Sequence, residues 1–179
     1  MTSEADRRRL LQIARDAIVA HVSGASILSS DDADPEGRRA GVFVTLHIAG
    51  ALRGCIGHME NDEPLPRRVI RCAIAACSAD PRFPAVSGAE VSSLAIEISL
   101  LGSLQPIAGP DEIEIGRHGL VIEKGWRRGL LLPQVATEWT WDPETFLSQT
   151  CRKAGLPKDA WKNGATISRF EAEVFGEHY

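Results

Sequence analysis

The stretch ALRGCIGHM, residues 51–59, contains the side chain best suited to covalent chemistry, the thiol of Cys55. A thiol is nucleophilic only when ionised, which requires a nearby positive charge or a helix N-terminus. Arg53 lies two residues before Cys55, and in a regular strand the two side chains point to the same face, so the guanidinium is placed to lower the pKa of the thiol. Gly54 and Gly57 would let a ligand approach the backbone closely. The stretch therefore predicts a ligand-binding strand with a candidate nucleophile.

A second reading of Cys55 is structural, because a free cysteine most often behaves as a small buried hydrophobe. The register of a hairpin decides between the two readings. A two-residue loop at Gly50–Ala51 pairs Cys55 with Leu46 on an apolar face, whereas a three-residue loop pairs it with Thr45 on a polar one. A slip of one residue moves every side chain of the strand to the other face. Both registers are open on the sequence alone.

Two further residues are candidates for acid–base catalysis. Glu97 is on the polar side of an alternating strand, and it becomes an acid or base if that side lines the same cleft as Arg53. His118, in GRHGL before a strand, is a candidate general base. The more common roles are a solvated strand residue for Glu97 and a turn residue for His118.

The segment DPRFP, residues 80–84, supplies candidate ligand-binding groups. Arg82 offers a planar fork of donors that fits a carboxylate or phosphate, and Phe83 adjoins it. Gln134, in LLPQVA, offers an amide. In the structural reading, Asp80 bonds the local backbone and the prolines fix a turn.

No metal site is predicted. Cys55 and His58 form a C-x-x-H pair, to which His47, Glu97 or His118 could add a ligand. Zinc sites normally show two close ligand pairs at fixed spacing, and the second pair is absent. The motifs of nucleotide-binding folds and of the common hydrolases are also absent.

Composition narrows the classes of partner. The chain has 179 residues and a formal net charge of −4, which disfavours binding to nucleic acid or to an anionic membrane. No apolar run approaches the ~18 residues of a membrane span, and the first residues do not resemble a signal peptide. The four cysteines form no C-x-x-C pair, so free thiols and a cytoplasmic location are expected.

Hydrophobic periodicity predicts an α+β fold, with a mainly antiparallel sheet packed against helices. The predicted elements are a helix opening at Ser3 and running through 10–18, a hairpin over 42–58 turning at Gly50, a buried helix over 69–77, a strand over 95–101, a hairpin over 119–133 turning near Gly125, a helix from Asp142 to Gly155, and a strand over 165–175. A polar, mobile loop is expected at about 24–40. The four tryptophans are expected to pack internally.

Several motifs in order resemble those of the AMMECR-type domain family, also called protein A of the AmmeMemoRadiSam system. They are LRGCIG, DPRFP, EISLL, HGLVI, GLLLPQVA, FLSQTCRKAGLP and FEAEVF. The resemblance covers residues 8–177 and implies one domain with a larger and a smaller subdomain, both chain ends being in the larger. It also implies a Memo-type protein and a radical-SAM enzyme as partners. It brings no reaction, substrate or cofactor, and His58 and Ala85 depart from the usual pattern.

Two functional hypotheses follow. In the first, the chain is a small-ligand-binding enzyme or a component of a modification system, with a cleft around Arg53–His58. Cys55 is then the nucleophile or covalent carrier, and Arg53 and Arg82 anchor an anionic group. In the second, the chain is a non-catalytic adaptor that docks a partner protein on the same glycine-rich strand.

Overall fold

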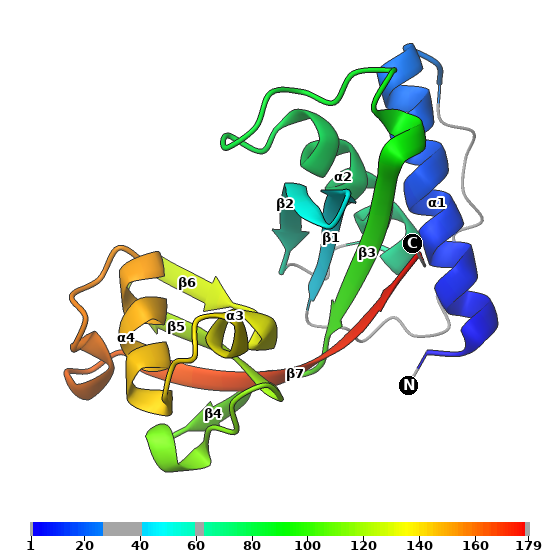
Figure 1. Cartoon of the computed structure of the whole chain (residues 1–179). Helices are drawn as coiled ribbons and strands as arrows, with labels where there is room; N and C mark the ends of the chain where they lie inside the picture. The colour runs from blue at the N-terminus through cyan, green and yellow to red at the C-terminus, as the bar shows by residue number, and fades with distance from the viewer. Residues whose placement is uncertain (1, 27–40, 60–62, 178–179) are drawn as a thin grey trace. The chain divides into compact units, whose positions relative to one another are not determined.

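The computed structural model describes residues 2–26, 41–59 and 63–177, and it divides into two compact units (Figure 1). Unit 1 comprises Met1–Leu100 and Glu173–Tyr179, and unit 2 comprises Leu101–Ala172. Hydrogen-bonded strands follow the order β2-β1-β3-β7-β5-β6, with β4 also paired to β7. The pairs of β1 with β2, β4 with β7, and β5 with β6 and β7 are all antiparallel. The predicted α+β class with a mainly antiparallel sheet is confirmed.

Unit 1 consists of two long helices and a small sheet. Its elements are α1 (Glu4–Ser23), β1 (Gly41–Ile48), β2 (Ala51–His58), α2 (Leu65–Ser78), η1 (Val91–Ser93) and β3 (Leu94–Leu101), completed by the end of β7 (Thr166–Gly176). The predicted cap of the first helix is confirmed, since the Ser3 hydroxyl accepts the backbone N–H of Asp6 at 3.1 Å. Gly24, at φ +72°, ends this helix in the left-handed conformation typical of a helix C-terminus.

The core of unit 1 lies between its helices and one face of its sheet. Alternate residues of β1 and β3 enter it, and they meet the apolar sides of α1 and α2. These strand residues are Val42, Val44, Leu46, Ile96, Ile98 and Leu100, all essentially without solvent exposure. Because side chains alternate along a strand, Thr45 and Glu97 belong to the opposite, polar face. That face carries the candidate site.

Unit 2 is built on three antiparallel strand pairs and two helices. Its elements are β4 (Gln105–Ile107), η2 (Pro110–Glu112), β5 (His118–Lys124), β6 (Arg127–Leu131), α3 (Pro133–Glu138), α4 (Pro143–Lys153), η3 (Ala160–Lys162) and the first part of β7. Asp142 caps α4 as predicted, because its carboxylate accepts the Thr145 N–H at 2.7 Å. A separate core forms here around Phe146, Leu120 and Ile122.

The hairpin of β1 and β2 turns at two residues with positive φ, Ala49 (49°) and Gly50 (79°). Ile48 pairs with Ala51, so the loop consists of the two residues Ala49 and Gly50. It begins one residue before the predicted two-residue loop at Gly50–Ala51, and it is one residue shorter than the alternative three-residue loop. Both loop predictions were therefore wrong. Two positive φ angles are typical of the type I′ turn, which matches the twist of the flanking strands.

The strain of alanine in this turn leads to a prediction. Ala49→Asn should raise the free energy of unfolding by about 0.5–1 kcal/mol, because asparagine tolerates the left-handed region better than alanine does. Urea unfolding with an unchanged slope would measure the gain. The neighbouring exposed substitution Ala51→Asn should not stabilise the chain. A midpoint for Ala49→Asn at or below that of the parent would contradict the strained turn.

Some predictions about the elements were incomplete or wrong. The short strand β4 was missed because three residues carry too little periodicity to be recognised. Internal packing was wrong for Trp126 and Trp139, which are 87% and 67% exposed. Most of the predicted loop at about 24–40, namely residues 27–40, is outside the described residues, as are Asn61 and Asp62 before α2.

Candidate functional site

A β-bulge in the first hairpin determines where Cys55 points. Leu46 pairs with Gly54 and His47 with Leu52, so Arg53 is an extra residue on β2. This insertion shifts the register by one and sets Cys55 opposite Thr45. The two side chains interact, with the Thr45 hydroxyl 3.2 Å from the Cys55 sulfur. Cys55 is thus half-buried on the polar face of unit 1, not in its core.

The DPRFP segment docks on the outer edge of β2 through one carboxylate. Asp80 is 4% exposed and accepts the Cys55 backbone N–H at 2.9 Å. The same carboxylate binds the guanidinium of Arg82 through Nε at 3.0 Å and Nη2 at 2.7 Å. The bonds from Arg82, followed by that from the Cys55 N–H, hold the pKa of Asp80 well below its usual range. The predicted bond of Asp80 to the local backbone is confirmed, because the Arg82 N–H also donates to this carboxylate at 3.0 Å.

Arg53 is held by the segment that follows DPRFP. Its guanidinium donates to the Glu90 carboxylate at 2.9 Å and to the Pro84 carbonyl at 2.8 Å. Arg53 lowers the pKa of Glu90 to about 2. The Phe83 ring lies 6.0 Å from the guanidinium carbon of Arg53 and 5.5 Å from that of Arg82. Both arginines that could anchor an anion are therefore already paired with carboxylates.

The thiol of Cys55 is not activated in this environment. Burial raises its pKa, and the Thr45 hydrogen bond and the positive charge of Arg82 only partly oppose that effect. Asp80 and Glu97 raise the pKa further. A thiol with a raised pKa is protonated at neutral pH. Cys55 is accordingly a neutral hydrogen-bonding group here.

Glu97 differs from the other acids of this region. It is half-buried on the polar face of β3, and within the described part of unit 1 its carboxylate has no ion pair or hydrogen bond. Its influence on the pKa of Cys55 places the two groups in one electrostatic environment. Ser99, two residues along the same strand, is 1% exposed, and no described residue bonds its hydroxyl.

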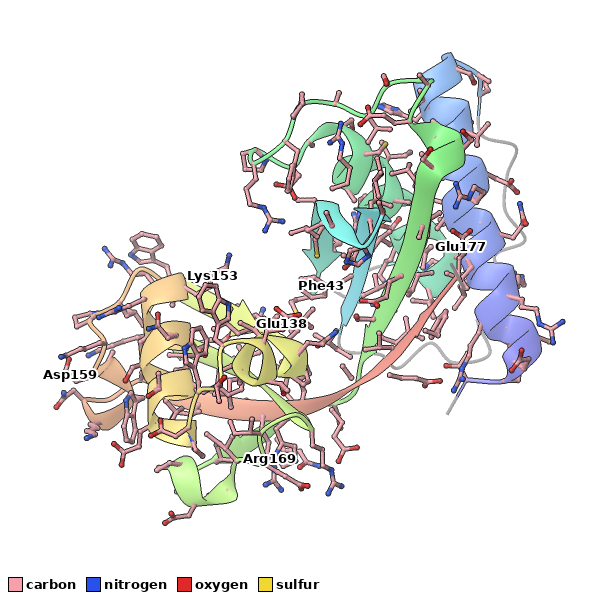
Figure 2. All side chains as sticks on the ribbon, in the orientation of Figure 1. Phe43, Glu138, Lys153, Asp159, Arg169 and Glu177 are labelled. Carbon is pink, nitrogen blue, oxygen red and sulfur yellow. The ribbon has the colours of Figure 1, made fainter. Side chains whose placement is uncertain are left out.

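The glycines of LRGCIG are explained by packing. A Cβ on Gly54 would lie 2.2 Å from the backbone oxygen of Ala76 in α2. A Cβ on Gly57 would lie 2.1 Å from the ring of Phe43, a residue labelled in Figure 2. The close approaches inferred from these glycines are therefore made by the protein's own helix and aromatic ring.

The side chains of Cys55 and His58, the C-x-x-H pair, do not point toward a common metal site. His58 pairs with Val42 and Cys55 with Thr45, so the two side chains belong to opposite faces of β2. Within residues 2–26, 41–59 and 63–177, no three His, Cys, Asp or Glu side chains lie close enough together to hold a metal ion.

Two candidate residues belong to unit 2. His118 begins β5 and is 6% exposed, with Nδ1 accepting the Glu114 N–H at 2.9 Å. Gln134 is in the first turn of α3, and its buried side-chain oxygen has no partner among the described residues. Unit 1 thus brings together Cys55, Glu97 and the Arg82–Phe83 pair, whereas His118 and Gln134 form part of the other unit.

Comparison with known proteins gives the family. The AMMECR1 family model matches residues 11–175. The chain belongs to the AMMECR1 family. A relative from Methanothermobacter thermautotrophicus is 46% identical, covering 98% of this chain and 96% of its own. One from Thermococcus gammatolerans is 47% identical, covering 95% and 89%.

A solved member of the AMMECR1 family has the same fold. The crystal structure of an uncharacterized protein from Pyrococcus horikoshii matches with a TM-score of 0.87 and 42% identity, over 96% of this chain and 91% of that one. Across the described residues, no helix is both long and apolar enough to cross a membrane.

Sequence reasoning missed the central role of Asp80 in this AMMECR1 chain. Its carboxylate joins the backbone of β2 to Arg82, yet it was assigned only a local role beside a turn. The available signal was an acid next to a proline, and such a residue commonly binds backbone N–H groups. That signal does not predict that the N–H group bound by Asp80 is the one of Cys55 in β2.

Proposed function

We propose that the polar face of unit 1 binds a small ligand through a cationic or hydrogen-bond-donating group. The single observation that supports this proposal most is the carboxylate of Glu97, which has no hydrogen bond or ion pair with any described residue and is on the same face as Cys55 and Thr45. A half-buried carboxylate without a counter-charge attracts a positive group more strongly than a solvated one does. The proposed ligand therefore has an amine or a similar donor.

This proposal changes the chemistry first expected of the site. Arg53 and Arg82 were the expected anchors of an anion, but Glu90 and Asp80 already neutralise them. Cys55 is protonated, so in our proposal it contacts the ligand as a neutral thiol and is not a resting nucleophile. Arg82 and Phe83 form the rim of the site, because the Arg82 side chain is 54% exposed.

The resemblance to protein A of the AmmeMemoRadiSam system supports a place for the chain beside a Memo-type protein and a radical-SAM enzyme. In the proposed role, the chain binds a ligand for a modification carried out with these partners. An adaptor that pairs through the edge of β2 has less support. The Cys55 N–H on that edge is already bonded to Asp80, and the Cys55 carbonyl is 3.5 Å from Arg82.

Charged thiol reagents test whether the electrostatic potential around Cys55 is negative, as the proposal requires. The ratio of the Cys55 reaction rate with the cationic trimethylammonium-ethyl methanethiosulfonate to its rate with the anionic sulfonatoethyl methanethiosulfonate should be higher than the same ratio for free cysteine. Glu97→Gln should reduce this preference about fivefold, the factor expected for roughly 1 kcal/mol between partly exposed charges. Peptide mass spectrometry separates Cys55 from the three buried cysteines.

Controls make the reagent test specific. Glu138→Gln removes an exposed acid of unit 2 and should leave the preference unchanged. Taking the ratio of the two rates cancels any change in the ionised fraction of the thiol. Equal preference in the parent and in Glu97→Gln would refute the proposed cation site.

The pH dependence of Cys55 alkylation is a separate prediction. Since burial raises the thiol pKa, the iodoacetamide rate should reach half its maximum at a more alkaline pH than for free cysteine. Cys55→Ser identifies the background from other thiols. A midpoint at or below that of free cysteine would instead support the nucleophile hypothesis.

A further inference from the structure

Unit 2 contains a small hollow with polar walls at one end of its sheet. Its cavity volume is about 250 Å³, and its walls include Ser103, Gln105, His118, Arg169 and Glu171. Cross-strand pairs place Gln105 opposite Arg169 and His118 opposite Glu171. Figure 2 shows Arg169 on β7, beside β4. This is well above the ~10–15 Å³ that one water molecule needs, so the hollow has room for a small polar group.

The positive charge of Arg169 is not neutralised by its neighbours. Its guanidinium donates to the Glu112 carbonyl and, at 3.4 Å, to the side-chain oxygen of Gln105. Both acceptors are neutral, and Arg169 has no carboxylate partner within residues 2–26, 41–59 and 63–177. A half-buried guanidinium with neutral partners retains its attraction for an anion.

The acid on the rim of the hollow is already engaged. Glu171 binds Arg117 at 2.8 Å, and Arg117 also binds Glu114 at 3.1 Å. Arg117 and the two acids form an exposed cluster of their own. Arg117 is shared between two acids, so the cluster has a net charge of −1, but its side chains are about 60% exposed and solvent screens them. Arg169 is the charged group of the walls that has no carboxylate partner among the described residues.

His118 supplies a second donor with a defined orientation. Because Nδ1 accepts the Glu114 N–H, the proton of the neutral ring is on Nε2. No described residue accepts a hydrogen bond from Nε2. Burial, together with the positive charges of Arg169 and Arg117, lowers the pKa of His118 and keeps the ring neutral. The ring thus offers one N–H donor in a hollow that also contains a guanidinium.

We propose that this hollow binds the anionic end, a carboxylate or phosphate group, of a small molecule. Arg169 provides the charge, His118 donates from Nε2, and the Ser103 hydroxyl is a further donor in the wall. A pocket of this size is smaller than the ~300–1,000 Å³ typical of drug-sized ligands. The hollow therefore has room for a compact anionic group.

Titration with inorganic phosphate and with acetate, each at constant ionic strength against chloride, tests the site in the full chain. The readout is the ring ¹⁵N signal of His118 in NMR spectra, assigned by its loss in His118→Asn. We expect a saturable shift with at least one of the two anions. Saturation by phosphate alone, by acetate alone or by both supports the site and identifies the preferred group.

Arginine variants show whether the shift reports binding at the hollow. Arg169→Gln should weaken binding about tenfold or more, since it removes a charge-assisted contact. Arg169→Lys should retain part of the phosphate affinity, because it keeps a point charge without the fork. Arg152→Gln removes an exposed charge from α4 of the same unit and should leave binding unchanged. No saturable shift with either anion, or equal binding in Arg169→Gln, would overturn the proposal.

Discussion

Asp80→Ala is expected to lower the free energy of unfolding by about 2 kcal/mol, because a partly buried backbone N–H loses its acceptor and a half-exposed ion pair is removed. The Asp80 side chain is almost fully buried and bonds both the Cys55 N–H and the Arg82 guanidinium. Alanine leaves that N–H without its acceptor, and the 80–90 segment then keeps its bonds with Arg53 of β2. Chemical denaturation should show a lower midpoint.

Companion variants separate the two roles of this carboxylate. Asp80→Asn retains an acceptor for the Cys55 N–H but loses the charge, so it should be less damaging than alanine. Arg82→Ala and Asp80→Ala should be clearly non-additive, because they remove one shared interaction. Asp111→Ala, an exposed acid in unit 2, should leave stability unchanged. A loss of unfolding free energy below about 1 kcal/mol for Asp80→Ala would show that this carboxylate does not stabilise the contact between the 80–90 segment and β2.

The same carboxylate should contribute to acid unfolding. Since the folded pKa of Asp80 is lowered, its contribution is fully present above the unfolded value of about 3.9. The contribution is then lost as the pH falls from that value through the folded pKa below it. The stability difference between the parent and Asp80→Ala should therefore shrink below about pH 4. A difference that stays constant down to pH 2 would show that the charge is not the source.

The elements of the fold were largely predictable because their signals are local. Ser3 and Asp142 cap the helices that they were predicted to cap, and alternation identified β3 and β7. The register of the first hairpin was not predictable. It depends on the extra residue Arg53, whose side chain is fixed by Glu90, 37 residues further along the chain. The residue inserted at the bulge has its bonding partner far along the chain, so the periodicity of the strand alone does not predict it.

Only part of the membership of the candidate site was predictable, since His118 and Gln134 belong to the other unit, and its electrostatics were not. Cys55, Glu97 and Arg82 do belong to one region of unit 1, as the spacing and the resemblance implied. The expected activation of the thiol failed, because Arg53 turns to Glu90 and burial dominates. Formal charge cannot show which arginines are already paired. The contrast with Arg169, which has only neutral described partners, emerged from three-dimensional contacts alone.

Gly54→Ala should be the most damaging single-methyl addition in unit 1, with a loss of about 3 kcal/mol, the upper end of the usual cost of overpacking. The added Cβ would lie 2.2 Å from the Ala76 backbone oxygen, and neither β2 nor α2 can yield by rotating a side chain. Relief requires the strand to move away from the helix. The free energy of unfolding from urea titration measures the loss.

Gly88→Ala is the matched control, because a Cβ there meets nothing within 4 Å and the backbone has no positive φ. It should be neutral in the same titration. Strand displacement in Gly54→Ala should also disturb the adjoining pair of Cys55 with Thr45, so Cys55 alkylation should accelerate in the folded protein. Equal stability of the two alanine variants would show that β2 does not rest on α2 at Gly54, and unchanged alkylation would show that the pairing of Cys55 does not depend on that contact.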